Sequence, residues 1–182
     1  MNKECIKKYG VVLRRLQVED LEMVRHWRNH PKVSQHMVYR QHITEEMQIA
    51  WFSRINNAHN YYFIIEWESR SVGLINIRDI NETDNSGEAG VFFWDDACLN
   101  SDVPPRSSLA IYDFAYEVLG LRFVRAQILK SNIRAIRFNK YMGYRLQAGQ
   151  EAEDPQLYHQ SREDFFVWRN KVAGLFEKNN ES

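Results

Sequence analysis

The sequence predicts a mixed α/β fold in which one curved sheet carries helices on its faces. Segments with the alternating pattern of strands are interspersed with segments that have helical spacing, in the order β-α-α-β-β-β-α-β-α-β-β. The length of 182 residues and the hydrophobic content of 44% suit a single domain with a substantial core. We therefore expect one domain over residues 1–182, with its core at about 11–169 and a frayed polar end at 177–182.

The N-terminal part predicts a strand followed by two helices. Residues 11–16 are the candidate strand, and residues 20–27 have apolar side chains along one helical face. Pro31 makes continuation of that helix unfavourable. Thr44 is a suitable N-cap for the second helix, and two glutamates follow in its first turn. The expected buried stripe of this helix comprises Ile49, Phe52 and Ile55.

The rest of the chain predicts six further strands and two helices. Residues 61–67, 72–80 and 88–94 are rich in β-formers and are separated by polar turns. A helix from about residue 107 ends at Gly120, residues 123–129 alternate as a strand, and Asn132 caps a helix that ends at Gly143. The late strands are expected at 157–159 and 164–169.

Composition excludes several classes of protein. Lys plus Arg equal Asp plus Glu at 24 each, so the general positive charge of a nucleic-acid-binding protein is absent, although a small basic pocket for a phosphorylated ligand is compatible with this balance. No apolar stretch has the length of a membrane span, and the N-terminus lacks the apolar run of a signal peptide. Cys5 and Cys98 do not suggest a disulfide framework. We expect a cytoplasmic protein without nucleic-acid or membrane partners.

The stretch 107–144 carries the most specific motif of the chain. It ends in N-x-R-A-I-x-F-N-K-x-M-G-Y, after a helix and a strand. In this order of elements the chain resembles the C-terminal half of the GCN5-related N-acetyltransferases, the GNAT family. The resemblance covers roughly residues 11–169. It implies a mixed, mostly antiparallel curved sheet flanked by helices, and transfer of an acetyl group from acetyl-CoA to a primary amine.

Motifs in the first half point to a subgroup of that family. They are L-R-R-L-x-x-x-D-L, H-W-R-N-H-P-x-V-x-x-x-M and H-I-T-x-E-x-x-x-W-F. They resemble members that acetylate amino sugars on nucleotide carriers, and the enzymes that acetylate N-terminal amines of ribosomal proteins share much of this framework. A non-catalytic ligand-binding relative is the third hypothesis. The expected partner is a small-molecule amine, and the chain is expected to be a monomer or a homodimer.

The resemblance places the arm of acetyl-CoA along the strand 88–94. Backbone N–H groups of Val91, Phe92 and Phe93 would bind the pantetheine amide and the thioester carbonyl, in a slot that opens just after Trp94 where two neighbouring strands separate. The same three residues are also typical of any buried strand. Glu88 is the first candidate for a base that orders a proton-accepting water, although a solvated charge at a strand end is the alternative. Asn132 would contact the pantetheine, or act as an N-cap only.

Two departures from the family pattern concern phosphate binding and proton donation. The glycine-rich loop before the central helix is replaced by L-N-S-D-V-P, and prolines have no N–H to donate. Arg106, Ser107 and Ser108 could supply an altered phosphate site at the helix start, or only cap a rigid turn. Asn139 stands where many relatives have a tyrosine that protonates the leaving thiolate, and it is a far weaker acid.

The first helix and the segment after it are expected to wall the acceptor pocket. An aromatic ring beside a sugar and a guanidinium near a diphosphate are suitable contacts, but a core tryptophan and a surface arginine are the alternative. We expect no metal site, because the histidine spacing lacks the accompanying glutamate of a ligand motif. The expected acceptor-binding residues are Trp27, Arg28, Asn29, His36 and Met37.

Overall fold

The computed structural model describes residues 4–177 and contains one eight-stranded sheet, in the order β1-β2-β3-β4-β5-β6-β8-β7. Neighbouring strands are antiparallel, except that β5 and β6 are parallel. The predicted mixed, mostly antiparallel sheet is thereby confirmed. The strands are β1 (Cys5–Lys8), β2 (Val11–Arg15), β3 (Tyr61–Trp67), β4 (Arg70–Asn81), β5 (Ser86–Phe93), β6 (Phe123–Ile128), β7 (Arg145–Leu146) and β8 (Gln156–Ser161).

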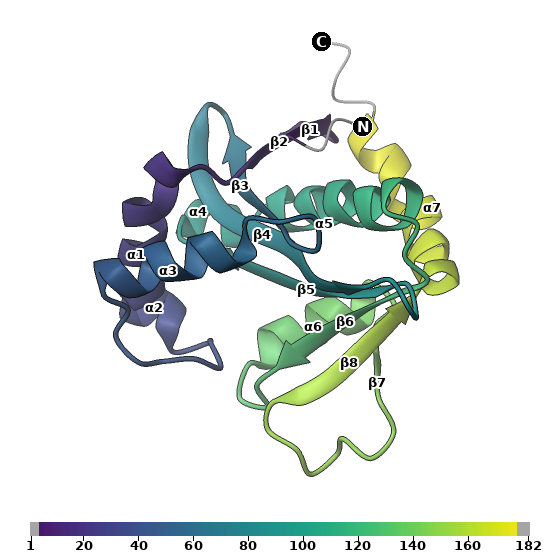
Figure 1. Cartoon of the computed structure of the whole chain (residues 1–182). Coiled ribbons are helices and arrows are strands. Elements are labelled where there is room, and N and C mark those ends of the chain that lie inside the picture. The colour runs from purple at the N-terminus through teal and green to yellow at the C-terminus, as the bar shows by residue number, and fades with distance from the viewer. Residues whose placement is uncertain (1–3, 178–182) are drawn as a thin grey trace.

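Helices cover both faces of this sheet (Figure 1). One hydrophobic core lies between the sheet and the central and C-terminal helices, and a smaller one lies beneath the first and third helices. The helical elements are η1 (Val18–Asp20), α1 (Leu21–Asn29), α2 (Pro31–Ser34), α3 (Glu45–Ile55), α4 (Asp96–Leu99), α5 (Val103–Asp113), the π-helical η2 (Phe114–Val118), α6 (Ile133–Tyr141) and α7 (Arg162–Glu177).

Local sequence signals set several of these boundaries. The Thr44 hydroxyl accepts a hydrogen bond from the Met47 N–H at the start of α3. Pro31 occupies the first turn of α2, where its missing N–H costs nothing. Gly120 (φ +69°) and Gly143 (φ +98°) adopt left-handed backbone just after helices, a conformation that glycine adopts without strain. The start of α3 and the glycine stops at 120 and 143 were therefore predicted from the residues that cause them, whereas the central helix α5 begins at Val103, four residues before its expected start.

The predicted strand at 164–169 is wrong, because this segment lies within helix α7. Glu163 and Asp164 occupy the first turn of α7, where acidic side chains favour a helix. Phe165, Trp168 and Val172 are buried at three- and four-residue spacing, which is helical periodicity. Of the polar end expected at 177–182, residues 178–182 lie outside the described part of the chain.

The predicted buried stripe of α3 is only partly correct. Phe52 and Ile55 pack against the smaller core, but the Ile49 side chain is 50% exposed. Gln48 is buried in its place. The buried face of the helix therefore passes through Gln48, Phe52 and Ile55, at four- and three-residue spacing, and Ile49 lies outside it. As a result, α3 presents a polar amide to the interior of the protein.

The parallel pair β5–β6 separates early, and this separation positions the site. Pairing between the two strands covers only Ser86–Glu88 against Phe123–Arg125. From Ala89 onward β5 has no partner on that side, and the two strands diverge (Figure 1). We expected the separation after Trp94, but it occurs six residues earlier, in the middle of β5. The gap therefore runs along the second half of the strand instead of beginning at its end.

Two further findings concern the described residues. Cys5 and Cys98 are both free thiols. Within residues 4–177, no helix combines the length and apolar character needed to cross a bilayer.

Candidate acetyl-transfer site

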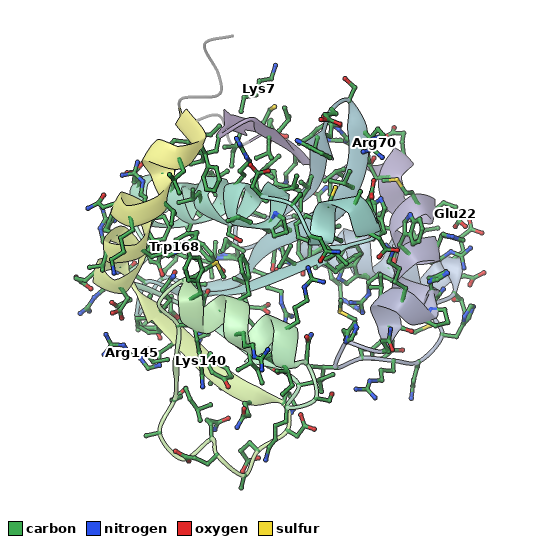
Figure 2. All side chains as sticks on the ribbon, turned by 180° about the vertical axis from the view of Figure 1, so that it is seen from behind. Lys7, Glu22, Arg70, Lys140, Arg145 and Trp168 are labelled. Atoms are coloured by element: carbon green, nitrogen blue, oxygen red, sulfur yellow. The ribbon has the colours of Figure 1, made fainter. Side chains whose placement is uncertain are left out.

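A cleft of about 1650 Å³ opens where β5 and β6 separate. One wall comes from α1, α3 and the loop after α2, and the opposite wall comes from α5 and α6. Figure 2 shows side chains from both halves, with Glu22 and Arg70 marking the N-terminal half and Lys140 and Arg145 the C-terminal half. The cleft therefore has two sides, joined through the gap in the sheet. Following the sequence prediction, we call the side lined by α1, α3 and the loop after α2 the acceptor side, and the side lined by α5 and α6 the cofactor side.

The edge of β5 offers unpaired N–H groups to the gap. The Trp94 N–H donates to the Val72 carbonyl at 3.0 Å, so it points toward β4. N–H direction alternates along an antiparallel strand. The N–H groups of Val91 and Phe93 therefore point the other way, beyond the last pair of β5 with β6, where β6 has left. Such a row can bind a ligand amide or a developing oxyanion.

Phe92 differs from its neighbours in this row. By the same alternation its N–H points toward β4, so the prediction that it donates to the cofactor arm is wrong. Its side chain instead packs against the smaller core and lines the cleft. Phe92 therefore contributes an aromatic surface to the acceptor side.

The N-terminus of α5 has no free N–H group for a phosphate. The Val103 N–H donates to the Ser101 hydroxyl at 3.1 Å, and the Arg106 N–H donates to the Asp102 carbonyl at 3.0 Å. The two residues between them are prolines and have no N–H. All four positions of the first turn are therefore closed, and the helix start does not fit a pyrophosphate.

The predictions for Arg106 and Ser107 as cofactor contacts are wrong for their side chains. The Arg106 guanidinium is buried behind the helix, where it donates to the Tyr9 carbonyl at 2.8 Å and to Asp102 at 2.7 Å. It also lies 4.6 Å from the Phe176 ring centre. Ser107 is fully buried and lies outside the cleft. Only Ser108, two residues from Arg106 and thus about 200° around the helix, lines the cleft.

Helix α6 forms the floor of the cofactor side. Asn132 caps it by accepting from the Ala135 N–H at 3.1 Å, and its side chain also lines the cleft. Asn139 lines the cleft too, and its amide donates to the Ala135 carbonyl at 2.9 Å. Both predicted positions therefore face the cavity. The donor capacity of Asn139 is partly taken up by its own helix.

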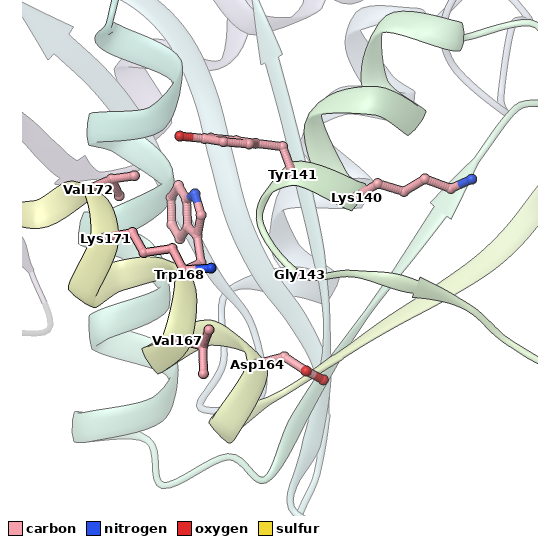
Figure 3. A pocket seen from close by; sticks show the side chains of 8 residues that line it. All are labelled: Lys140, Tyr141, Gly143, Asp164, Val167, Trp168, Lys171 and Val172. Carbon is pink, nitrogen blue, oxygen red and sulfur yellow. The ribbon is translucent and has the colours of Figure 1, made fainter.

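Tyr141 lies at the end of α6 and turns toward the C-terminal helix. Its ring meets the Trp168 ring edge-on at 6.2 Å. Figure 3 shows the two rings together in a small separate pocket, with Lys140 pointing away from them. This pocket has a volume of about 310 Å³. Although Tyr141 also borders the large cleft, its ring does not replace the tyrosine that Asn139 lacks.

Glu88 lies at the point where β5 and β6 separate, and its carboxylate is paired. It accepts a short hydrogen bond from Arg78 on β4, and its other oxygen accepts from the Gln127 amide at 3.2 Å. The Glu88 side chain is 14% exposed and lines the cleft. Glu88 therefore lines the cleft as the acidic partner of an ion pair. It is not the solvated charge at a strand end that was the alternative interpretation.

The acceptor side contains a cation without a carboxylate partner. Arg28 lines the cleft, half-buried, with its guanidinium 5.8 Å from the Phe92 ring centre. Among the described residues it makes no ion pair. Burial lowers the pKa of Arg28, and the nearby Arg78 adds to the effect. A desolvated cation of this kind is a site for an anionic group.

The other predicted acceptor residues divide into two groups. His36 and Met37 line the cleft, from the loop after α2. Trp27 and Asn29 do not. Trp27 stacks on Trp94 at 6.1 Å, and the Asn29 amide is tied to the Ile43 backbone by bonds of 2.9 and 2.8 Å. These two residues support the wall of the cleft from behind.

Sequence reasoning missed three polar residues on the acceptor side. Gln48 on α3, Tyr62 on β3 and Asn76 on β4 all line the cleft and are largely buried. Burial raises the pKa of the Tyr62 hydroxyl, with a smaller opposing effect of Arg78. The available signal was a lone asparagine within the apolar run V-G-L-I-N-I, since a buried polar residue in a strand needs an explanation. Among the described residues, no group of three or more His, Cys, Asp or Glu could hold a metal ion.

A family model described as the acetyltransferase (GNAT) domain matches residues 11–145. The chain belongs to the GNAT acetyltransferase family. As a member of this family the protein is an N-acetyltransferase, and GNAT acetyltransferases use acetyl-CoA. The unpaired N–H groups of Val91 and Phe93 on β5 fit the pantetheine arm of acetyl-CoA, whereas the start of α5, which has no free N–H, does not fit the pyrophosphate of acetyl-CoA.

Individual proteins of known kind are also similar to this chain. The acetyltransferase PseH of Campylobacter jejuni is 26% identical over 123 residues, which are 67% of this chain and 74% of PseH. The fold is shared with apo FdhC, described as a nucleotide-linked sugar GNAT (TM-score 0.79, 20% identity, 94% of this chain and 98% of that one). It is shared too with spermidine N-acetyltransferase from Vibrio cholerae in complex with CoA and spermine (TM-score 0.73, 14% identity, 86% and 98%).

Proposed function

We propose that this GNAT acetyltransferase moves the acetyl group of acetyl-CoA to the primary amine of an amino sugar carried on a nucleotide. The observation that carries the proposal is the acceptor side of the cleft. It combines the unpaired Arg28 guanidinium with buried, uncharged amides. A cation suits the diphosphate of a nucleotide carrier, and amides suit a sugar ring. Similarity to PseH and to a nucleotide-linked sugar GNAT supports the same acceptor class.

The residues of the chain supply positioning and charge stabilisation. Bound acetyl-CoA supplies an activated thioester. The N–H groups of Val91 and Phe93 hold the carrier arm and stabilise the oxyanion as the amine attacks the carbonyl carbon. Holding both reactants in one cleft contributes much of the acceleration. Glu88 orders the water that removes the proton of the amine. The carbon–sulfur bond then breaks, and CoA leaves as a thiolate that takes its proton from solvent, because Asn139 is not an acid.

Phosphate binding on the cofactor side falls to α6 in this proposal. Arg134 lines the cleft and donates to the Leu99 carbonyl and, at 3.4 Å, to the Asn100 side chain. Its partners are uncharged, so its charge is not neutralised. Arg137 lines the cleft one turn further along. These two side chains supply the positive charge that the closed start of α5 does not.

A thiol-release assay with acetyl-CoA and a panel of amines tests the acceptor. The panel contains a UDP-linked amino sugar, the free amino sugar, spermidine and a short peptide with a free N-terminus. We expect the highest kcat/KM for the UDP-linked sugar. Replacing Arg28 with alanine should raise KM for the UDP-linked sugar but not for the free one. Preferred transfer to the peptide, or no transfer to either sugar, would refute the proposal.

A further inference from the structure

Two buried amides on the acceptor side of the cleft have polar atoms without partners. Gln48 on α3 is 4% exposed, and its Nε2 makes no hydrogen bond to any described residue. Asn76 on β4 is 7% exposed, and its Oδ1 is likewise unpartnered. Both side chains line the same cleft. One atom is a donor and the other an acceptor, so together they match a group that can do both.

The position beside Asn76 on β5 requires a glycine. Tyr62, Asn76 and Gly90 face one another across β3, β4 and β5 in register, so their positions lie in one row. Gly90 has no side chain, and a Cβ built there would lie 3.0 Å from the Asn76 Nδ2 and 3.3 Å from its Oδ1. The Asn76 amide therefore lies over Gly90, and the glycine contributes no side chain of its own to this part of the cleft wall.

Leaving these two atoms unpaired is costly for the fold. A buried polar group without a partner costs about 1–3 kcal/mol, whereas an apolar side chain of the same shape avoids that cost. Buried polar atoms without partners are rare in native proteins, and each needs an explanation. Since both lie in one cleft, a common bound group explains them together.

We infer that Gln48 and Asn76 form a specificity subsite that recognises hydroxyl groups of the acceptor. A hydroxyl can accept from the Gln48 amide or donate to the Asn76 oxygen, so a hydroxylated ring offers a partner to each orphan atom. The subsite selects a hydroxylated ring over a plain aliphatic amine, because an amine without the hydroxyl leaves both amides unpaired. The inference rests on the proposed function and names the residues that recognise its acceptor.

Near-isosteric variants separate recognition from folding. The test uses Gln48→Met and Asn76→Leu, with Gln147→Met as a control at an exposed position outside the cleft. Calorimetry measures the Kd of UDP-glucosamine and of UDP alone for each protein. We expect each cleft variant to bind UDP-glucosamine about tenfold more weakly, with UDP affinity unchanged. The Tm should be unchanged or higher, because an unsatisfied buried group has been removed.

The outcomes distinguish this inference from the proposed function. Unchanged Kd for UDP-glucosamine in both variants, or wild-type protein that binds UDP-glucosamine no better than UDP, overturns the subsite. A lower Tm with equal losses for both ligands assigns the amides a structural role and also overturns it. Thiol release from acetyl-CoA is measured separately. If no amino sugar is acetylated, the proposed function is refuted. The binding data still test whether the two amides recognise the sugar.

Discussion

The Glu88 carboxylate and the Arg78 guanidinium form an ion pair at the last position where β5 is still paired with β6. Arg78 faces Glu88 from β4, and Arg125 is the paired residue on β6. Beyond it, the N–H groups of Val91 and Phe93 point into the open gap. One strand therefore supplies both the acidic group and the amide donors, and the separation of β6 exposes them together.

Replacing Glu88 with glutamine should lower kcat by about a hundredfold and leave the Kd of CoA unchanged, because the side chain keeps its shape but loses its capacity as a base. Thiol-release assays give kcat, and calorimetric titration with CoA gives the Kd. Glu66→Gln is the matched control, since Glu66 is a strand carboxylate paired with Arg14 at 2.8 Å outside the cleft. Equal kcat values for the two variants would remove Glu88 from the mechanism.

Replacing Arg106 with alanine should destabilise the protein without affecting CoA affinity. The buried guanidinium holds the Tyr9 carbonyl and Asp102, and no other described group replaces these bonds. Their loss should cost about 1–3 kcal/mol, which is a Tm decrease of several degrees. Differential scanning calorimetry gives the Tm, and titration with CoA gives the affinity. A weakened Kd at unchanged Tm would place Arg106 at the phosphates after all.

The elements of this fold were predictable where a local cause sets them. Strand β3 has the bounds that its run of β-formers predicts, and Thr44 caps α3 as expected. The strand expected at 164–169 failed because its aromatic residues suit either structure. Only the packing of Phe165 and Trp168 against the core shows the helical spacing. Local propensity was therefore sufficient for capped and alternating segments, but not for a short aromatic run.

The sequence predicted where the site lies but not which side chains line it. The motif at 107–144 located the cleft, and the positions of Asn132 and Asn139 on its wall agree with it. Arg106 was misplaced because α5 begins at Val103, and each residue turns the helix by about 100°. Asn76 was missed because its role depends on register with Gly90, which no local pattern encodes.

Replacing Arg134 with alanine should weaken CoA binding about tenfold and reduce its dependence on salt. The affinity for acetyl-pantetheine, which lacks the pyrophosphate, should not change. Calorimetric titrations at low and high salt provide the comparison. Arg122→Ala serves as the control, since Arg122 is exposed and lies outside the cleft. If both variants bind CoA as the wild type does, the phosphates are held elsewhere.

The buried tyrosine pair predicts a loss of stability at high pH. Burial raises the pKa of Tyr112 to about 12 from its ordinary 10.0, and the Tyr144 hydroxyl donates to it at 2.9 Å. Above pH 10 the unfolded chain loses this proton while the folded protein keeps it, so the free energy of unfolding falls between pH 10 and about 12. The full contribution, present below pH 10, is on the order of 2–3 kcal/mol.

Urea unfolding from about pH 8 to about pH 11.5 measures this slope. Tyr112→Phe should be less stable than the wild type near neutral pH if the hydroxyl pair matters, but should lose less stability as the pH rises. Tyr39→Phe, at an exposed tyrosine, should keep the wild-type slope. Tyr144, whose pKa burial also raises, retains part of the slope in the Tyr112 variant. Identical slopes for the wild type and Tyr112→Phe would show that the Tyr112 hydroxyl ionises as freely in the folded protein as in the unfolded chain.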